Sequence, residues 1–271
     1  MRGRNGFWAL AFHTLFVIFV LAPIAVVCLI AFTPESYLAM PTNGFSLRWF
    51  EALLDNRDFV TSFQTSLMLG LLSASAAALV AIPASIAIVR YRFPGRLFLL
   101  TLCMSPLMIP SIVLGVAFLR YLSQIGLGST MPGLILSHVI IILPFILRTV
   151  MNSFGSLDPA LDNAAASLGS SPWTTFRRVT FPLIVPGVVS GWILAFITSF
   201  DEVTMTIFIA SPGLTTLPVR LMLYIEDSID PLVAAVSAVL IALAVLTMLI
   251  IDRLFGLDKI LIGNIDSDKN S

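Results

Sequence analysis

Long apolar stretches separated by short polar segments run along almost the whole chain. They occupy residues 8–33, 63–89, 97–120, 131–152, 183–210 and 232–254. About 20 apolar residues in helical conformation span the hydrocarbon core of a bilayer, and each stretch reaches that length. The pattern predicts an all-α integral membrane protein with six transmembrane helices.

The same pattern predicts the domain organisation. We expect a cytoplasmic N-terminus at residues 1–7, one six-helix transmembrane domain at residues 8–256, and a polar, disordered cytoplasmic tail at residues 257–271. The first apolar stretch, from Trp8 to Phe32, is longer than the apolar region of a signal peptide, and no small-residue cleavage site follows it. We therefore expect it to be retained as the first span.

Composition indicates a lipid environment and excludes several functions. Hydrophobic residues make up 58% of the 271 residues and charged residues 11%, whereas a soluble domain carries about 25% charged residues. A net charge of zero gives no general electrostatic attraction to nucleic acid. The two histidines, His13 and His138, lie far apart in apolar stretches, so we expect no metal site. We interpret each histidine as a hydrogen-bonding group between helices.

Basic residues predict the orientation of the spans. With the N-terminus inside, the cytoplasmic segments hold Arg2, Arg4, Arg90, Arg92, Arg96, Arg148, Arg177, Arg178, Arg253, Lys259 and Lys269. The outer segments hold only Arg48, Arg57, Arg120 and Arg220. Because Lys and Arg are enriched in cytoplasmic loops, we expect both termini to be cytoplasmic.

The predicted outer loop between the first two spans contains a short helical pattern. Apolar residues recur at near-helical spacing from Phe45 to Leu54. We expect a helix that lies on the outer membrane surface or against a partner. Trp49 is interpreted as an aromatic anchor at the membrane interface.

The predicted cytoplasmic loop at residues 153–182 carries the signals of two consecutive helices. Asp158 followed by Pro159 is a typical helix start, because a carboxylate caps the first N–H groups and proline fits the first turn. Gly169 is a typical helix stop, and Ser171 begins the second helix. The residues alone leave two interpretations open: a knob that binds a soluble partner, or a hairpin that packs on the ends of the spans.

This loop resembles a known motif. Residues 163–173 read NAAASLGSSPW, and together with residues 183–187 they resemble the EAA loop of binding-protein-dependent ABC permeases. Further segments are similar to the spermidine/putrescine permeases of that family: YRFPG at 91–95, SFDEV at 199–203, TLP at 216–218 and DP at 230–231. The similarity in layout covers the chain from the first span onward.

The resemblance implies an ABC type I importer permease in the bacterial inner membrane. Its implied partners are a second, homologous permease subunit, a dimer of ABC ATPase subunits, an extracytoplasmic solute-binding protein and the lipid bilayer. The sequence contains no GxxxxGKS or GxxxxGKT phosphate loop, so we expect no enzyme activity and no cofactor here, with ATP and Mg²⁺ bound by the ATPase. The expected function is half of a translocation pathway for spermidine, putrescine or a related small organic cation.

The resemblance also assigns residues that couple the permease to the ATPase. They are Asp158, Asp162, Asn163, Ala164, Ala165, Leu168 and Gly169. One position departs from the family, because Asn163 stands where the family has glutamate, and a contact that needs a carboxylate is weakened. Asp162 cannot replace it directly, since one residue rotates a helix by about 100°. We still expect the helix to dock on an ATPase.

Asp201 and Glu202 are the only ionisable residues of the predicted fifth span. A carboxylate in lipid costs about 2.5–3.5 kcal/mol, so both must face protein or water. With Trp192 and Phe200 they form a candidate substrate pathway for a polyamine, since aromatic faces attract cations. A contact with the partner permease or a polar gate is the alternative. On a helix only one of two adjacent acids can face the pathway.

Other functions stay open at this point. The chain can be an ABC permease for another solute, such as an opine, an amino-acid derivative, an aminophosphonate, thiamine or an oxyanion, because the binding protein does most of the selecting. An ATP-independent secondary transporter often shows inverted repeats, and none is evident between the two halves. An intramembrane hydrolase needs a paired catalytic set or a metal-binding histidine motif, and neither is evident.

Overall fold

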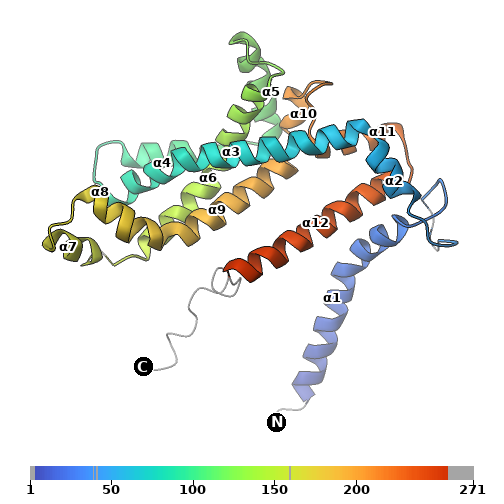
Figure 1. Ribbon diagram of the computed structural model, residues 1–271, viewed down its shortest axis with the longest axis horizontal. Coiled ribbons are helices and arrows are strands. Elements are labelled where there is room, and N and C mark those ends of the chain that lie inside the picture. The colour runs from blue at the N-terminus through green and yellow to red at the C-terminus, as the bar shows by residue number, and fades with distance from the viewer. Residues whose placement is uncertain (1–3, 39, 41, 159, 256–271) are drawn as a thin grey trace. The chain divides into compact units, whose positions relative to one another are not determined.

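The protein is described by a computed structural model that covers residues 4–38, 40, 42–158 and 160–255 (Figure 1). Every element within these ranges is helical, apart from one isolated bridge between Ser211 and Leu214. Pro159 and the tail predicted at residues 257–271 lie outside the described residues. The predicted all-α class is confirmed.

The elements follow one another along the chain with short connections. The α-helices are α1 (Arg4–Ile30), α2 (Arg48–Asp55), α3 (Arg57–Arg90), α4 (Arg96–Met104), α5 (Ser111–Gln124), α6 (Met131–Gly155), α7 (Ala160–Ser167), α8 (Pro172–Thr175), α9 (Phe181–Asp201), α10 (Thr206–Ile209), α11 (Leu217–Asp227) and α12 (Leu232–Phe255). A 3₁₀ turn, η1 (Ser105–Met108), follows α4, and a π-helical turn, η2 (Phe176–Thr180), joins α8 to α9.

Within the described residues, five helical segments are long and apolar enough to cross a membrane. They are Gly6–Ile30, Arg57–Arg90, Met131–Gly155, Pro172–Asp201 and Leu232–Leu249. The remaining predicted span, the third, is a pair of helical segments, Arg96–Met108 and Ser111–Gln124, with an angle of 106° between them. The prediction of six spans therefore holds when this bent pair is taken as one span.

The bend corrects the prediction of a continuous third span at residues 97–120. Ile109 is extended, with φ −97° and ψ 128°, and Pro110 then begins the next helix. A proline disfavours the helical conformation of the residue before it and lacks the N–H that would continue the hydrogen-bond ladder. By contrast, Pro23, Pro83 and Pro144 lie inside continuous helices.

The fifth span also differs from the prediction of residues 183–210. It begins at Pro172, continues through the π-helical turn, and ends at Asp201. A proline ring at position 182 would crowd the carbonyl of residue 178 in a regular α-helix, and the wider turn η2 lies at that point. At the other end Glu202 is extended, with φ −72° and ψ 114°, so the helix stops nine residues earlier than residue 210 had implied.

The chain divides into two compact units, and the larger comprises Thr61–Arg220. One apolar cluster of its core is shared by α3, α6 and α9. The buried members include Ala74, Ala77, Ala81 and Ile88 of α3, Ile142, Ile146, Leu147 and Val150 of α6, and Ile184 and Ala195 of α9. A buried hydrogen bond from Ser85 Oγ to the Leu147 carbonyl, 3.3 Å long, adds a polar link between α3 and α6.

Helices α6 and α9 run alongside each other at very short range (Figure 1). A Cβ atom added at Gly187 would lie 1.8 Å from Ser153 Oγ, and one added at Gly191 would lie 2.1 Å from Thr149 Oγ1. Small residues permit this approach of two backbones, which gives dispersion contacts along the whole pair. Both glycines therefore lie where α9 has no room for a larger side chain.

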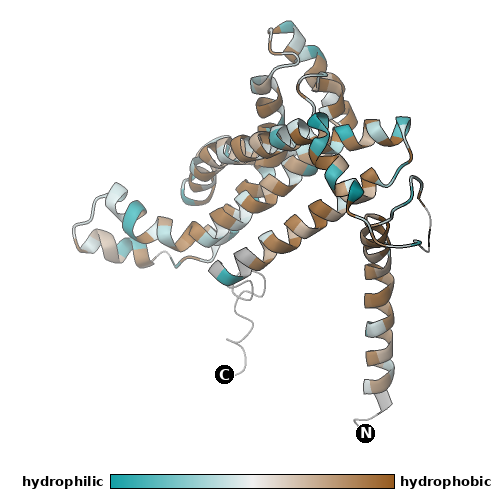
Figure 2. Cartoon of the chain, turned by 45° about the vertical axis from the view of Figure 1, so that its right-hand side comes forward, coloured by the Kyte–Doolittle hydropathy of each residue, from teal (hydrophilic) through white to brown (hydrophobic). Residues whose placement is uncertain are grey.

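The smaller unit comprises Met1–Val60 and Leu221–Ser271, in which α12 packs against α1 and α2. Helix α1 consists mostly of hydrophobic residues (Figure 2), and its large apolar side chains from Phe7 to Leu21 are mostly exposed within the chain. Only lipid or another membrane protein can cover such a surface without a large cost in free energy. The exposure of α1 therefore supports its assignment as a membrane span.

The predicted surface helix is present as α2, but Trp49 is not an interfacial anchor. Its side chain is 9% exposed, and its indole N–H donates to the Glu35 carbonyl over 3.1 Å. The Arg48 guanidinium lies 4.7 Å from the centre of the Trp49 ring and donates to the Pro34 carbonyl. The loop before α2 thus folds back over the helix and covers the ring, a contact that amphipathic spacing alone does not reveal.

The start of α12 has its own polar anchor. Asp230 Oδ1 accepts the N–H of Leu232, and Asp230 Oδ2 accepts the hydroxyl of Tyr224 over 2.7 Å. Partial burial, the bond to Asp230 and its negative charge raise the pKa of Tyr224 to about 12. Asp230, of the DP pair at 230–231, therefore caps the start of α12.

The short distance between α6 and α9 gives a prediction for Gly187→Ala. The added methyl group would overlap Ser153, so we expect the free energy of unfolding to fall by about 1–3 kcal/mol. Thermal unfolding of the purified protein in detergent, followed by tryptophan fluorescence, measures this loss. Gly155→Ala on α6 is the control, because nothing lies within 4 Å of its added Cβ. Equal melting temperatures for the two variants would contradict the tight α6–α9 contact.

Candidate functional site

The loop at residues 153–182 folds as the sequence predicts, with local capping at each helix end. Asp158 Oδ1 accepts the N–H of Ala160 over 2.8 Å and starts α7. Gly169, at φ +78°, ends that helix in a conformation that costs glycine little, and the N–H of Ser170 bonds back to the Ala165 carbonyl. Ser171 Oγ accepts the N–H of Thr174 and starts α8. The helix observed is Ala160–Ser167, slightly shorter than the predicted 158–168.

Helix α7 presents one face to its surroundings and one to the bundle. Asn163 and Ala164 are exposed, and the Leu168 side chain that follows the helix is 89% exposed. Asp162 and Ala165 are half-buried. The structure thus separates the predicted coupling residues into two groups: Asn163, Ala164 and Leu168 are open to a partner, whereas Asp162 and Ala165 face the protein.

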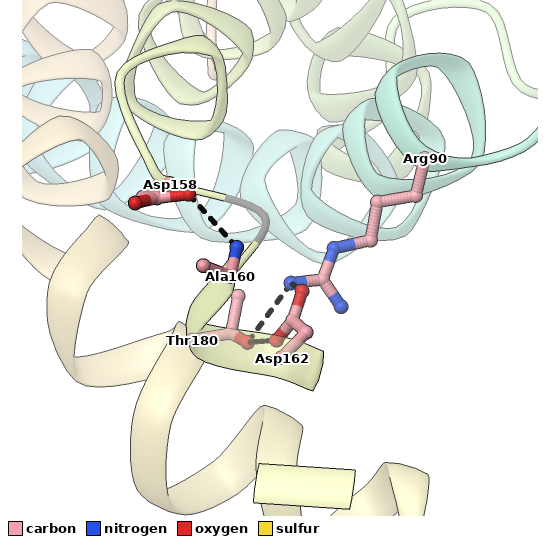
Figure 3. A network of polar contacts seen from close by, with 5 residues as sticks. All are labelled: Arg90, Asp158, Ala160, Asp162 and Thr180. Atoms are coloured by element: carbon pink, nitrogen blue, oxygen red, sulfur yellow. Dashed lines mark hydrogen bonds and ion pairs between the residues drawn. The ribbon is translucent and has the colours of Figure 1, made fainter. Parts of the chain in front are cut away.

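A polar network joins Asp162 to two other elements (Figure 3). Asp162 Oδ2 pairs with Arg90 Nη2, at the end of α3, over 2.5 Å. Asp162 Oδ1 accepts the hydroxyl of Thr180, just before α9, over 3.2 Å. Arg90 Nη2 also donates to Thr180 Oγ1 over 3.0 Å, which closes a triangle of contacts. The guanidinium further lies 5.6 Å from the ring centre of the buried Phe154 on α6.

The sequence analysis missed Arg90 and Thr180 as members of this site. Arg90 entered it only as one of the basic residues that set orientation, and Thr180 had no distinguishing signal. The available signal was Asp162, a single carboxylate on an alanine-rich helix. A half-buried carboxylate needs a polar partner. Nothing in the spacing of residues 90 and 162 indicates that the two meet, since their separation along the chain exceeds any local rule.

The two acids of the candidate pathway, Asp201 and Glu202, lie at the opposite end of α9 from Thr180. Asp201 is the exposed last residue of α9, and Glu202 follows it. Glu202 Oε1 accepts the N–H of Met205 over 2.8 Å, directly before α10. The two acids therefore differ: Glu202 is engaged in holding the turn between α9 and α10, whereas Asp201 is available to solvent or a ligand.

An aromatic series leads along one side of α9 toward these acids. Trp192 and Phe196 stack with ring centres 5.8 Å apart and an angle of 7°, and Phe196 lies 6.0 Å from Phe200. Phe63 of α3 extends the series, 6.2 Å from Phe200. The spacing of four residues places the three α9 rings on one helical face. Trp192 and Phe200 were expected here, whereas Phe196 and Phe63 were missed.

Trp192 also has a polar contact within this series. Its indole N–H donates to Ser75 Oγ of α3 over 3.2 Å. The rings are half-buried, so their faces are partly open. Half-buried aromatic faces near an exposed carboxylate can attract an organic cation, by the ring quadrupole and by charge.

His138 forms a buried polar cluster between α6, α9 and α10. Its Nδ1 lies 2.8 Å from Ser199 Oγ and its Nε2 lies 3.1 Å from Thr206 Oγ1, and the side chain is 1% exposed. The interpretation of His138 as an interhelical hydrogen-bonding group is confirmed. His13 is exposed on α1. In the described part of the chain, no group of three or more His, Cys, Asp or Glu side chains could hold a metal ion.

The apolar helices of bilayer length are those of a membrane protein. Together with the capped and exposed helix α7, which lies in the loop between α6 and α9, they indicate a membrane permease subunit. Comparison with known proteins supports this class directly. The chain belongs to the family described as binding-protein-dependent transport system inner membrane component, whose sequence model matches residues 80–256, a range that includes α7 and α9. The resemblance first seen in the EAA loop is thereby confirmed.

Individual relatives match over nearly the full length. The spermidine/putrescine transport system permease protein PotC of Escherichia coli is 29% identical over 94% of this chain and 94% of that protein. A putative 2-aminoethylphosphonate transport system permease protein, PhnV of Salmonella paratyphi A, is 29% identical over 93% of this chain and 95% of that protein. Overall identity therefore does not separate the two substrates that these names give.

The fold is similar to that of solved ABC importers. A bacterial ABC transporter involved in the import of the acidic polysaccharide alginate contains a chain with a TM-score of 0.79 and 16% identity, covering 94% of this chain and 99% of that one. At such low identity the likeness concerns the fold alone. It confirms the predicted type I importer permease architecture.

The buried cluster around His138 gives a prediction for His138→Leu. Leucine cannot hydrogen-bond, so the buried hydroxyls of Ser199 and Thr206 lose their partner, and we expect a loss of about 1–3 kcal/mol in the free energy of unfolding. Thermal unfolding in detergent measures it. His13→Leu is the matched control, because His13 is exposed on α1 and the change should leave the melting temperature unaltered. A melting temperature for His138→Leu equal to that of the wild type would refute the role of this cluster.

Proposed function

We propose that this chain is one of two permease subunits of an ATP-driven importer for polyamines or a related small organic cation. Its partners in this proposal are a second, homologous permease, a pair of ATPase subunits and an extracytoplasmic solute-binding protein. The observation that carries the proposal is the exposed, capped helix α7, which connects to both α6 and α9 in a chain of the permease family.

Helix α7 supplies the connection to the ATPase. Asn163, Ala164 and Leu168 form its open face, and small side chains let another protein's backbone come close. When the ATPase pair closes, α7 moves with it and displaces the tightly packed α6–α9 pair. The permease then changes between inward-open and outward-open states, because the ATPase binds the two states with different free energy.

The proposed orientation places α7 and both termini in the cytoplasm. Arg148, Arg177 and Arg178 flank the α7 loop, which fits the enrichment of basic residues on the cytoplasmic side. The acids Asp201 and Glu202 then lie toward the outer side, where a binding protein would release its solute. The chain contributes no ATP-binding phosphate loop, so ATP and Mg²⁺ belong to the ATPase subunits.

The proposed substrate class rests on the relatives and on the pathway residues together. Spermidine and putrescine, in the name of PotC, and 2-aminoethylphosphonate, in the name of PhnV, all carry a protonated amine. Asp201 with the partly open rings of Trp192, Phe196 and Phe200 suits such a group. A phosphonate would require a cationic partner in addition, so the acidic and aromatic lining favours a polyamine.

Coupling through α7 gives a prediction for Gly169→Pro. Proline fixes φ near −65°, whereas Gly169 has φ +78°, so the end of α7 cannot form as observed. In nanodiscs that contain the assembled transporter, we expect ATPase stimulation by loaded binding protein to be lost. Gly155→Ala is the control, since its added Cβ meets nothing within 4 Å. Transport by wild type without ATP or a copurifying ATPase would replace this proposal by a secondary transporter.

The different surroundings of the two acids give a prediction for Asp201→Asn. The exposed Asp201 is the carboxylate open to substrate, so removing its charge should raise the KM for spermidine uptake about tenfold, equivalent to one lost ion contact. Uptake of labelled spermidine into proteoliposomes with the complete transporter measures it. Glu226→Gln, an exposed acid on α11, should leave KM unchanged. An unaltered KM in Asp201→Asn would remove Asp201 from the pathway.

A further inference from the structure

Arg90 is held in place by groups from three other elements. Its guanidinium pairs with Asp162 of α7 and donates to Thr180 at the end of η2 (Figure 3). It also lies over the ring of Phe154 on α6. As the last residue of α3, a cation there also interacts favourably with the negative end of the helix dipole. These contacts restrict a long side chain that would otherwise be free to move.

The chain itself connects α7 only to part of the bundle. Residues 156–159 join it to α6, and residues 168–171 join it to α8 and so to α9. Helix α3 ends well before α7 along the sequence, with α4, α5 and α6 between them, and meets α7 through the side chain of Arg90. The ion pair is therefore a link by which a displacement of α7 reaches the inner end of α3 directly.

The exposure of the ion pair indicates that it fixes the position of α7 more than it adds to the free energy of folding. The side chain of Arg90 is 30% exposed and that of Asp162 is 35% exposed. Ion pairs with such access to water add little to the free energy of folding. Their geometry is nonetheless specific here, because Thr180 bonds to both partners and closes the triangle. Loss of the pair should leave the fold intact and free α7 to rotate.

We infer that the Arg90–Asp162 ion pair is a latch that fixes the direction of α7 and ties α3 to it, so that the ATPase moves α3, α6 and α9 as one body. Asp162 and Arg90 are positioning residues in this scheme, and Asp162 does not dock on the ATPase. The inference rests on the proposed function, because it assigns a role within ATP-driven coupling. It also explains why Asp162 differs from its exposed neighbour Asn163.

The test uses the complete transporter in nanodiscs, with spermidine-loaded binding protein as the stimulus. Arg90→Ala and Asp162→Ala should each reduce stimulated ATPase activity and spermidine uptake about tenfold, while the amount of copurified ATPase stays at the wild-type level. Arg90→Lys keeps the charge but has a single ammonium, so it should lose less. Arg92→Ala is the control, since Arg92 is an exposed cation two residues away. This variant should show wild-type ATPase stimulation and spermidine uptake.

The reciprocal exchange distinguishes a latch from a general structural role. The double variant Arg90→Asp with Asp162→Arg restores opposite charges across the same gap, so uptake should recover to at least about half of the wild-type rate. Additive losses in the double variant, or wild-type coupling in both single variants, would overturn the inference. If wild type itself shows no ATPase coupling, the proposed function fails instead, so the two failures are separable.

Discussion

The backbone contact between α6 and α9 is the constraint on which the rest of the structure depends. Gly187 and Gly191 leave no space for a side chain of their own, because the side chains of Ser153 and Thr149 of α6 already lie against them. Neither helix can shift locally against the other without overlap. Helix α7 is attached to both, and the aromatic series lies on an adjacent face of α9. The pair therefore connects the exposed loop helix to the candidate pathway as a stiff unit.

The features that local chemistry determines were predictable from the sequence. Span number followed from apolar length, because a bilayer imposes the same requirement on each segment. The start of α7 at Asp158, its end at Gly169 and the start of α8 at Ser171 followed from capping, which involves only a few neighbouring residues.

The features that depend on distant parts of the chain were not predictable in the same way. Proline disfavours a continuous helix at residues 106 and 110, but the angle between the two halves of the third span depends on what each half packs against. Trp49 fitted a membrane anchor until the loop folded over it. Arg90 and Asp162 each carried a local interpretation, and only the fold brings the two charges together. Glu202 could not be told from Asp201 until its cap on the following turn was visible.

The length of α3 has a consequence for the membranes in which the protein can work. Its 34 residues extend about 50 Å, whereas the hydrocarbon core is about 30 Å thick. Both ends, each an arginine, can therefore reach the headgroup region even when the helix tilts. A thicker or thinner bilayer then changes the tilt of α3 and leaves both charges hydrated.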